Sequence, residues 1–332
     1  MKQLIQKLVE SIGPSGYETA VRNLVRAEVE KFAEDISVDT LGNLIVRKSQ
    51  KADGGLRIML AAHMDEIGLI VTHIDENGFG RVTTIGGVST RTCLGGRVRF
   101  VNGVQGVIGG ERLDGIDKVH SVEQLFIDVG ATGRADCPVK VGDVAAFERP
   151  FMDLGDRLVA KSMDDRISVA VLIETLRQIK TTPNELVFVF TTQEEVGTRG
   201  AGTAAYAVEP DLGISVDVTL VGDTPKGVRM EVSLGKGPAI KVRDGGMLAD
   251  PRLVRLMVEA AEKAGLPYQM EVLEGGTTDA RAMQLSRAGV PAGCVSIPCR
   301  YVHSPSEMVD YNDVQNSVKL LVELLSKPIK LG

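Results

Sequence analysis

The sequence contains no tryptophan, and aromatic residues make up only 4% of its 332 residues. Its four cysteines lack the CxxC spacing of a thiolate metal site, and a chain of this length does not need disulfide bonds to fold. We therefore expect reduced thiols and a cytoplasmic protein. No apolar run approaches the roughly 20 residues of a membrane span, and the first residues form an amphipathic pattern that differs from a signal peptide.

A surplus of basic residues is also missing, because 38 lysines and arginines stand against 44 aspartates and glutamates, giving a net charge of −6. Nucleic-acid binding requires a basic face along the phosphate backbone, so we expect no nucleic-acid partner. The surplus of carboxylates instead suits bound divalent cations. Hydrophobic residues make up 43% and charged residues 25%, which are ordinary values for a folded globular protein.

The length exceeds a usual domain of about 100–200 residues, which favours two domains or one domain with an insertion. Continuous apolar runs, typical of strands buried on both faces, alternate with helical patterns in residues 1–70 and again in 161–332. Residues 71–160 are instead rich in glycine and in short β-type runs. We predict an α/β domain with a mixed, largely parallel sheet flanked by helices, and an inserted barrel-like all-β domain at 71–160.

The N-terminal residues 1–35 show a helical pattern that is interrupted at Gly13 and Pro14. The pattern restarts at Ser15, and Glu18 stands three residues later, which is the spacing of a capping box. We therefore expect these two side chains to cap the start of a second helix.

Two adjacent glutamates follow the apolar run 186–190, which is rich in β-branched and aromatic residues and predicts a buried strand. Glu194 and Glu195 then lie near the carboxyl end of that strand, where open α/β sheets bind their ligands. Because neighbouring side chains of a pleated segment point to opposite sides, one glutamate could hold a cation while the other moves a proton. Taken alone, the pair fits a solvated acidic turn equally well.

Other ligand-type residues also stand at the ends of apolar runs or at a helix start. His63 follows the first buried strand, and Asp65 could orient its imidazole as metal ligation requires. A hydrogen-bonded core histidine is the alternative. Asp164 and Asp165 open a helix, where carboxylates also serve as caps. Two later apolar runs are followed by further residues of this type, Asp217 and His303.

One sheet edge could bring these side chains together, because parallel strands end on the same side. The set is His63, Asp164, Glu194, Glu195, Asp217 and His303. Three carboxylates and two imidazoles, with one carboxylate shared, would give three ligands to each of two ions and leave one residue as a base. Nitrogen and oxygen ligands without thiolate suit Zn²⁺, Co²⁺ or Mn²⁺, whereas imidazole argues against Ca²⁺ and Mg²⁺.

A nucleophilic enzyme finds less support, since no Ser lies in a G-x-S-x-G elbow. Cys299, four residues before His303, is the candidate for a thiol nucleophile. A glycoside hydrolase would use two carboxylates without metal. A metal-dependent deacylase or carboxypeptidase would use the same di-metal core but would recognise a free carboxylate.

The whole chain resembles the di-metal aminopeptidases of the glutamyl aminopeptidase and tetrahedral (TET) aminopeptidase family, whose members are often labelled endoglucanase. The matching segments are His63-Met64-Asp65, Met163-Asp164-Asp165-Arg166, Gln193-Glu194-Glu195-Val196-Gly197, Val216-Asp217-Val218, Gly276-Thr277-Thr278-Asp279-Ala280 and Arg300-Tyr301-Val302-His303-Ser304. The resemblance implies a di-zinc exopeptidase-like fold and an aminopeptidase acting on short peptides. It also implies a homo-oligomer, from a dimer to a tetrahedral dodecamer, with contacts from the inserted domain.

The resemblance also implies a ligand set for two divalent ions per subunit. Asp164 would bridge the two ions. His63 and Asp217 would complete one site, and Glu195 and His303 would complete the other. The preferred first residue of the substrate, whether acidic, basic or aliphatic, stays open at this stage.

The same resemblance also concerns three further residues. Glu194 would be the general base that takes a proton from the attacking water and passes it to the leaving amine. Asp65 would orient the imidazole of His63. Asp279 lies in a segment that lines the family's active site, and the resemblance assigns it no role.

Overall fold

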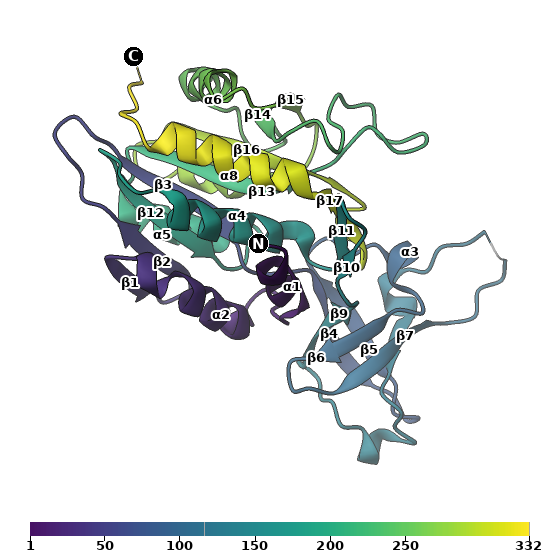
Figure 1. The fold of residues 1–332 in the computed structure, drawn as a ribbon. Coiled ribbons are helices and arrows are strands. Elements are labelled where there is room, and N and C mark those ends of the chain that lie inside the picture. The colour runs from purple at the N-terminus through teal and green to yellow at the C-terminus, as the bar shows by residue number, and fades with distance from the viewer. Residues whose placement is uncertain (116, 332) are drawn as a thin grey trace.

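A computed structural model describes residues 1–115 and 117–331 of the chain. A broad α/β domain contains both ends of the described chain, and a smaller β-barrel lies to one side of it (Figure 1). The chain leaves the α/β domain after β3 (Arg57–His63), forms the barrel, and returns through β10 (Met152–Asp153) and β11 (Arg157–Ala160). The inserted barrel therefore separates two halves of one α/β domain.

A large mixed sheet forms the centre of the α/β domain. Its remaining strands are β1 (Asp35–Val38), β2 (Leu44–Lys48), β12 (Glu185–Thr191), β13 (Leu212–Thr219), β14 (Ala239–Arg243), β15 (Gln269–Val272), β16 (Ala292–Arg300) and β17 (Glu307–Asp310). The strand order is β1-β2-β12-β3-β13-β16-β17-β11-β10, and β14, itself paired with β15, also pairs with β16. The four central strands β12, β3, β13 and β16 are parallel, so their carboxyl ends meet at one edge.

Helices cover both faces of this sheet. The helices on one face are α1 (Lys2–Glu10), α2 (Thr19–Val29), α4 (Met163–Gln178), α6 (Pro251–Lys263) and α8 (Tyr311–Leu325). The other face carries α5 (Arg199–Val208) and α7 (Asp279–Gln284). None of the helices in the described residues has both the length and the apolar content to cross a membrane.

The continuous apolar runs follow from this two-sided cover. In β3, Ile58 and Leu60 pack into the core beneath α4, whereas Met59 and Ala61 pack into the core beneath α5 and α7. Alternate residues of a strand point to opposite faces, so a strand covered on both sides has to be apolar throughout. Most charged residues of these strands therefore lie near the strand ends, at the sheet edge.

The barrel is closed and antiparallel, in the ring order β4-β5-β8-β7-β6-β9. Its strands are β4 (Gly68–Ile74), β5 (Gly80–Ile85), β6 (Arg97–Phe100), β7 (Gln105–Gly110), β8 (Leu125–Asp128) and β9 (Val144–Glu148), with the short helix α3 (Thr90–Cys93) between β5 and β6. Short 3₁₀ turns lie at Glu30–Phe32, Val122–Gln124 and Arg134–Asp136. The barrel begins before residue 71 and ends before residue 160, since β10 and β11 already pair within the large sheet.

The predicted capping box is wrong. Glu18 is the N-cap residue of α2, and no side chain caps that helix. The Ser15 hydroxyl instead donates to Asp65, and Glu18 Oε1 accepts from the backbone of Gly16 and Gln193. Hydrogen bonds with Asp65 and Gln193 at the sheet edge therefore replace the capping interactions that the sequence predicted for these two side chains.

Candidate active site

The six candidate residues meet at the carboxyl edge of the parallel strands and line one cavity of about 540 Å³. They come from the end of β3 (His63), the first turn of α4 (Asp164), the turn after β12 (Glu194 and Glu195), β13 (Asp217) and the turn between β16 and β17 (His303). Asp217 was expected at the end of its strand, but β13 continues to Thr219. The expected meeting of these residues at one edge is observed.

Asp164 lies between the two histidines. Its Oδ1 is 3.0 Å from His63 Nε2, and its Oδ2 is 3.2 Å from His303 Nε2. Glu195 Oε2 is 3.1 Å from the same nitrogen of His303. A carboxylate with one oxygen toward each imidazole has the arrangement needed to serve two ions at once.

The two glutamates do not lie in a pleated segment, so the argument from strand alternation is wrong. β12 ends at Thr191, and Gln193 has a left-handed φ of +56° before the turn that contains both glutamates. Glu194 Oε2 lies 3.9 Å from His63 Nε2, whereas Glu195 contacts His303. The two side chains still face different histidines, but the conformation of the turn determines their directions, and strand alternation does not.

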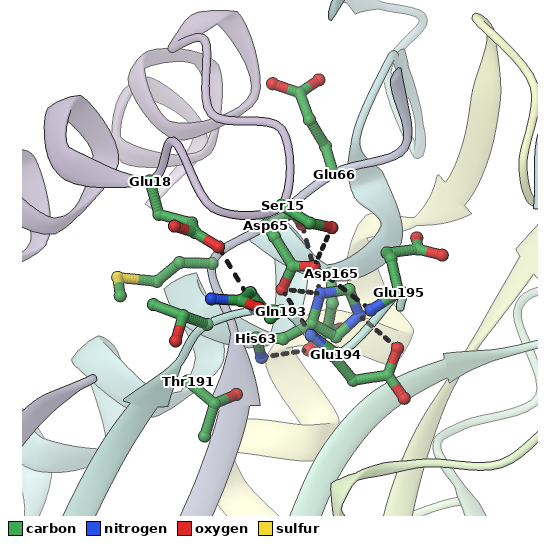
Figure 2. A network of polar contacts seen from close by, with 12 residues as sticks. Ser15, Glu18, His63, Asp65, Glu66, Asp165, Thr191, Gln193, Glu194 and Glu195 are labelled. Carbon is green, nitrogen blue, oxygen red and sulfur yellow. Dashed lines mark hydrogen bonds and ion pairs between the residues drawn. The ribbon is translucent and has the colours of Figure 1, made fainter. Parts of the chain in front are cut away.

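Asp65 holds this turn through both of its carboxylate oxygens. Oδ1 accepts from the Glu194 backbone N–H at 3.0 Å, and Oδ2 accepts from the Glu195 N–H at 3.1 Å (Figure 2). The Ser15 hydroxyl donates to Oδ2 at 2.6 Å. Burial alone would raise the pKa of Asp65, but His63 and these donors hold it below its usual value.

The imidazole of His63 also contacts Asp65. Its Nδ1 lies 3.2 Å from the Asp65 carbonyl oxygen and 3.4 Å from the carboxylate Oδ1. A proton on Nδ1 leaves Nε2 free to face the cavity, as a metal ligand requires. Asp65 therefore touches three of the candidate residues, which exceeds the single orienting contact expected from the sequence.

Sequence reasoning missed Glu307, which opens β17. Its Oε2 accepts from the Asp164 backbone N–H at 2.9 Å, and its Oε1 accepts from the His303 N–H at 2.8 Å. Only 2% of Glu307 is exposed, and burial raises the pKa of its carboxyl well above the usual value. Its position four residues after His303 carries no pattern by which the sequence could reveal it.

Two groups of ligand atoms lie close enough to hold an ion, with all atoms of a group within 4.8 Å. One group is His63, Asp164 and Glu195, and the other is His63, Asp165 and Asp217. Asp165 was not predicted as a ligand, and its Oδ2 accepts from the His63 backbone at 3.2 Å. Asp165 Oδ1 and Glu195 Oε1 are buried without a hydrogen-bond partner among the described residues. Such oxygens are costly to bury, and a bound cation would relieve that cost.

Asp279 supports the site from behind. It is buried at the start of α7, and its Oδ2 accepts from the Thr191 hydroxyl at 2.5 Å. Burial raises the pKa of Asp279 to about 6. Because Thr191 is the last residue of β12, this contact ties α7 to the strand end from which both glutamates follow.

The electrostatics of the cavity are dominated by buried carboxylates. Burial, reinforced by neighbouring carboxylates, raises the pKa of Glu194 and Asp217 well above their usual values. Burial alone would lower the pKa of His63, but Asp164 and Asp65 raise it well above 6.5. Asp164 and Glu195 likewise outweigh the effect of burial and raise the pKa of His303 to about 12. A metal ion has to displace these protons before the imidazoles can bind it.

The rest of the cavity wall is largely apolar and glycine-rich. Apolar side chains come from Val218, Leu220, Leu273 and Val302. The barrel contributes Gly87, where an added Cβ would lie 2.6 Å from His303 Nδ1, so only glycine allows this close approach. Lys241 also lines the cavity and forms a buried ion pair with Glu271 at 2.9 Å. The cavity is thus shaped by both the α/β domain and the barrel.

Cys299 does not suit a nucleophile. It is fully buried, its Sγ contacts the Arg300 carbonyl at 3.5 Å, and burial raises the pKa of its thiol well above 9.0. The reactive form of cysteine is the thiolate, which such an environment disfavours. The thiol-enzyme interpretation is therefore set aside.

Carboxylates and histidines clustered at the edge of a parallel-centred α/β sheet could hold the ions of a metal-dependent hydrolase. Residues 42–320 match the M42 glutamyl aminopeptidase family. A putative aminopeptidase of Acetivibrio thermocellus is 44% identical over 98% of both chains. An aminopeptidase structure from Desulfurococcus kamchatkensis has a TM-score of 0.94 and 40% identity, covering 98% of this chain and 94% of that one.

A third similar protein is known to form large assemblies. The TET1 peptidase of Pyrococcus horikoshii, which can assemble into a tetrahedron or a large octahedral shell, has a TM-score of 0.88 and 34% identity over 99% of both chains. The chain belongs to the M42 glutamyl aminopeptidase family. It is a metal-dependent aminopeptidase, as the sequence resemblance implied.

The raised pKa values predict how the stability of the metal-free protein depends on pH. His63 and His303 keep their protons in the folded chain above pH 6.5, whereas the unfolded chain releases them. Stability is therefore lost as pH rises, and the raised pKa values of Glu194 and Asp217 act in the same direction. The melting temperature of chelator-treated protein should fall between about pH 6.5 and 9, and Zn²⁺ should stabilise more strongly at the higher pH. A rising melting temperature in this window would contradict the assignment.

Proposed function

We propose that this aminopeptidase binds two divalent ions per subunit, Zn²⁺ or Co²⁺ with Mn²⁺ as a further candidate. The "His63 site" consists of His63 and Asp217, the "His303 site" of Glu195 and His303, and Asp164 serves both. One observation carries the proposal, namely the two oxygens of Asp164 facing two different imidazoles at 3.0 and 3.2 Å. Nitrogen and oxygen donors without thiolate suit these ions.

The reaction is the removal of N-terminal residues from short peptides. Bound at these sites, the ions would lower the pKa of a water molecule and polarise the scissile carbonyl. Glu194 takes a proton from the attacking water and returns it to the leaving amine. Burial moves the pKa of Glu194 upward, toward the range in which proton transfer at neutral pH is efficient. Asp65 fixes the Glu194 backbone and orients His63.

Recognition of a free amine distinguishes an aminopeptidase from other enzymes that use the same core. The cavity is rich in carboxylates, which can balance the positive charge of a substrate α-amine. A blocked amine lacks that charge and could not make this contact. The charge of the cavity therefore agrees with the family's activity.

Metal analysis and a substrate panel test this function together. Reconstitution with Co²⁺ or Zn²⁺ should load two ions per chain, and a chelator should abolish cleavage of aminoacyl-p-nitroanilides. N-acetylated analogues should resist cleavage. Zero bound ions would refute the mechanism, and cleavage of N-acyl amino acids or at the C-terminus would favour a deacylase or a carboxypeptidase. Acidic, basic and aliphatic members of the panel identify the preferred first residue.

Matched substitutions of the two glutamates separate their roles. Glu194→Gln keeps the shape but removes the base, so kcat should fall by about 10²–10⁴-fold while metal content stays near wild type. Glu195→Gln replaces an anionic ligand by a neutral amide, so this variant should need more metal, and excess metal should partly restore it. Activity measured alongside metal content distinguishes the two effects. Interchanged phenotypes would reverse the assignment, and unaffected variants would indicate a solvated acidic turn.

We also propose that the chain forms a homo-oligomer, a tetrahedral dodecamer built from dimers, and that it works in the cytoplasm. The similarity to the tetrahedral TET1 peptidase supports this proposal. The inserted domain at 71–160 would supply contacts between subunits, as an autonomous barrel beside the catalytic domain is free to do. An enclosed assembly would restrict substrates to peptides short enough to enter it.

Light scattering at micromolar protein concentration measures the assembly directly. A dodecamer has twelve times the chain mass of 35.5 kDa. A dimer would support contact between subunits but would contradict the enclosed assembly. A monomer at that concentration would refute the oligomer altogether.

A further inference from the structure

Glu307 joins two backbone segments that carry candidate metal ligands. Its two carboxylate oxygens accept the N–H of Asp164, at the start of α4, and the N–H of His303, in the turn between β16 and β17. Glu307 does not line the cavity, and it is buried behind the two residues that it contacts. A single side chain therefore couples two of the three residues assigned to the His303 site.

Neither segment supplies these two N–H groups with a helical or strand partner. Asp164 lies in the first turn of α4, where helices leave their N–H groups unpaired, and its φ and ψ of −73° and 103° are not helical. His303 has a left-handed φ of +61°, and Tyr301 in the same turn has +62°. Left-handed backbone is unfavourable for a residue with a side chain, so it persists only where surrounding contacts impose it. The bond from the His303 N–H to Glu307 is such a contact.

We propose that Glu307 is a positioning residue for the metal centre, holding Asp164 and His303 in the relative placement that the His303 site requires. This inference rests on the proposed two-ion function. Each of the two Glu307 oxygens accepts one of the two backbone N–H groups, a match that glutamine does not reproduce. A glutamine has one acceptor oxygen, and its NH₂ group would face the remaining backbone N–H. Glu307→Gln therefore releases one of the two ligand segments while preserving volume.

The test is a Co²⁺ titration of the purified full chain, followed by calorimetry and by the visible absorption of bound Co²⁺. Loss of a hydrogen bond behind a metal ligand typically weakens metal binding by about 10–100-fold. We expect Glu307→Gln to lose affinity by this factor for the ion of the His303 site and to lose less for the other ion, because Glu307 contacts two residues of the His303 site but only Asp164 of the His63 site. Excess Co²⁺ should restore the wild-type spectrum, because the ligand side chains themselves are intact.

Asp313 provides a matched control. Its two carboxylate oxygens each accept a backbone N–H at 2.7 Å, from Gly235 and Gly237, and it is as deeply buried as Glu307. Asp313→Asn makes the same chemical change at a place that does not line the cavity. Its melting temperature should fall with that of Glu307→Gln, whereas its Co²⁺ affinities and spectrum should stay unchanged.

Each outcome decides between a positioning role and a merely structural one. Wild-type affinities and spectrum in Glu307→Gln would overturn the inference, as would an equal loss of Co²⁺ affinity in Asp313→Asn. A Glu307→Gln chain that stays unfolded in saturating Co²⁺ would also overturn it, because bound ions should compensate for a lost positioning contact. If the wild-type chain binds no Co²⁺, the proposed function itself fails, which separates that failure from failure of this inference.

Discussion

The burial of several carboxylates in one place is the constraint on which the active site depends. Asp164, Asp165, Glu194, Glu195 and Asp217 share one region beside two histidines, and all but Asp164 have raised pKa values. Burial away from water opposes their ionisation, and the neighbouring carboxylates add to this effect. Protons on the imidazoles balance part of the charge, and divalent cations could balance the remainder. The same buried carboxylates therefore supply candidate metal ligands and destabilise the metal-free site.

The residues around the site act on its backbone as much as on its side chains. Asp65 accepts two consecutive N–H groups of the glutamate turn, and Glu307 accepts the N–H groups of Asp164 and His303, two candidate ligands from separate segments. The fully buried Arg166 donates to the Met64 carbonyl at 2.5 Å and to the Leu8 carbonyl at 2.8 Å. These charged groups tie α1, the end of β3 and the start of α4 together. Breaking such buried networks is costly, although their formation adds little net stability.

The sequence was most informative where a local pattern determines the structure. Two-sided burial makes the central strands apolar throughout, so their ends and the ligand-type residues beyond them were predictable. The paired ion sites came from family resemblance, since spacing alone does not show which carboxylate lies between two imidazoles. The turn at Glu194, the partner of Ser15 and the contact of Glu307 with Asp164 depend on hydrogen bonds between residues at least 50 positions apart or on a left-handed turn. No periodicity encodes such contacts, because they are set by how the elements pack.

The inserted barrel has a consequence for chain entropy. His63 and Asp164 are in contact although 101 positions separate them, and the barrel occupies most of that interval. Its first and last strands, β4 and β9, pair directly, with Gly68 opposite Ala146. Closing a loop costs free energy that grows by about 0.6 kcal/mol with each doubling of its length. Once the barrel has folded, only short segments outside it separate His63 from Asp164. A folded barrel therefore lowers the entropy that the chain loses when the two halves of the active site meet.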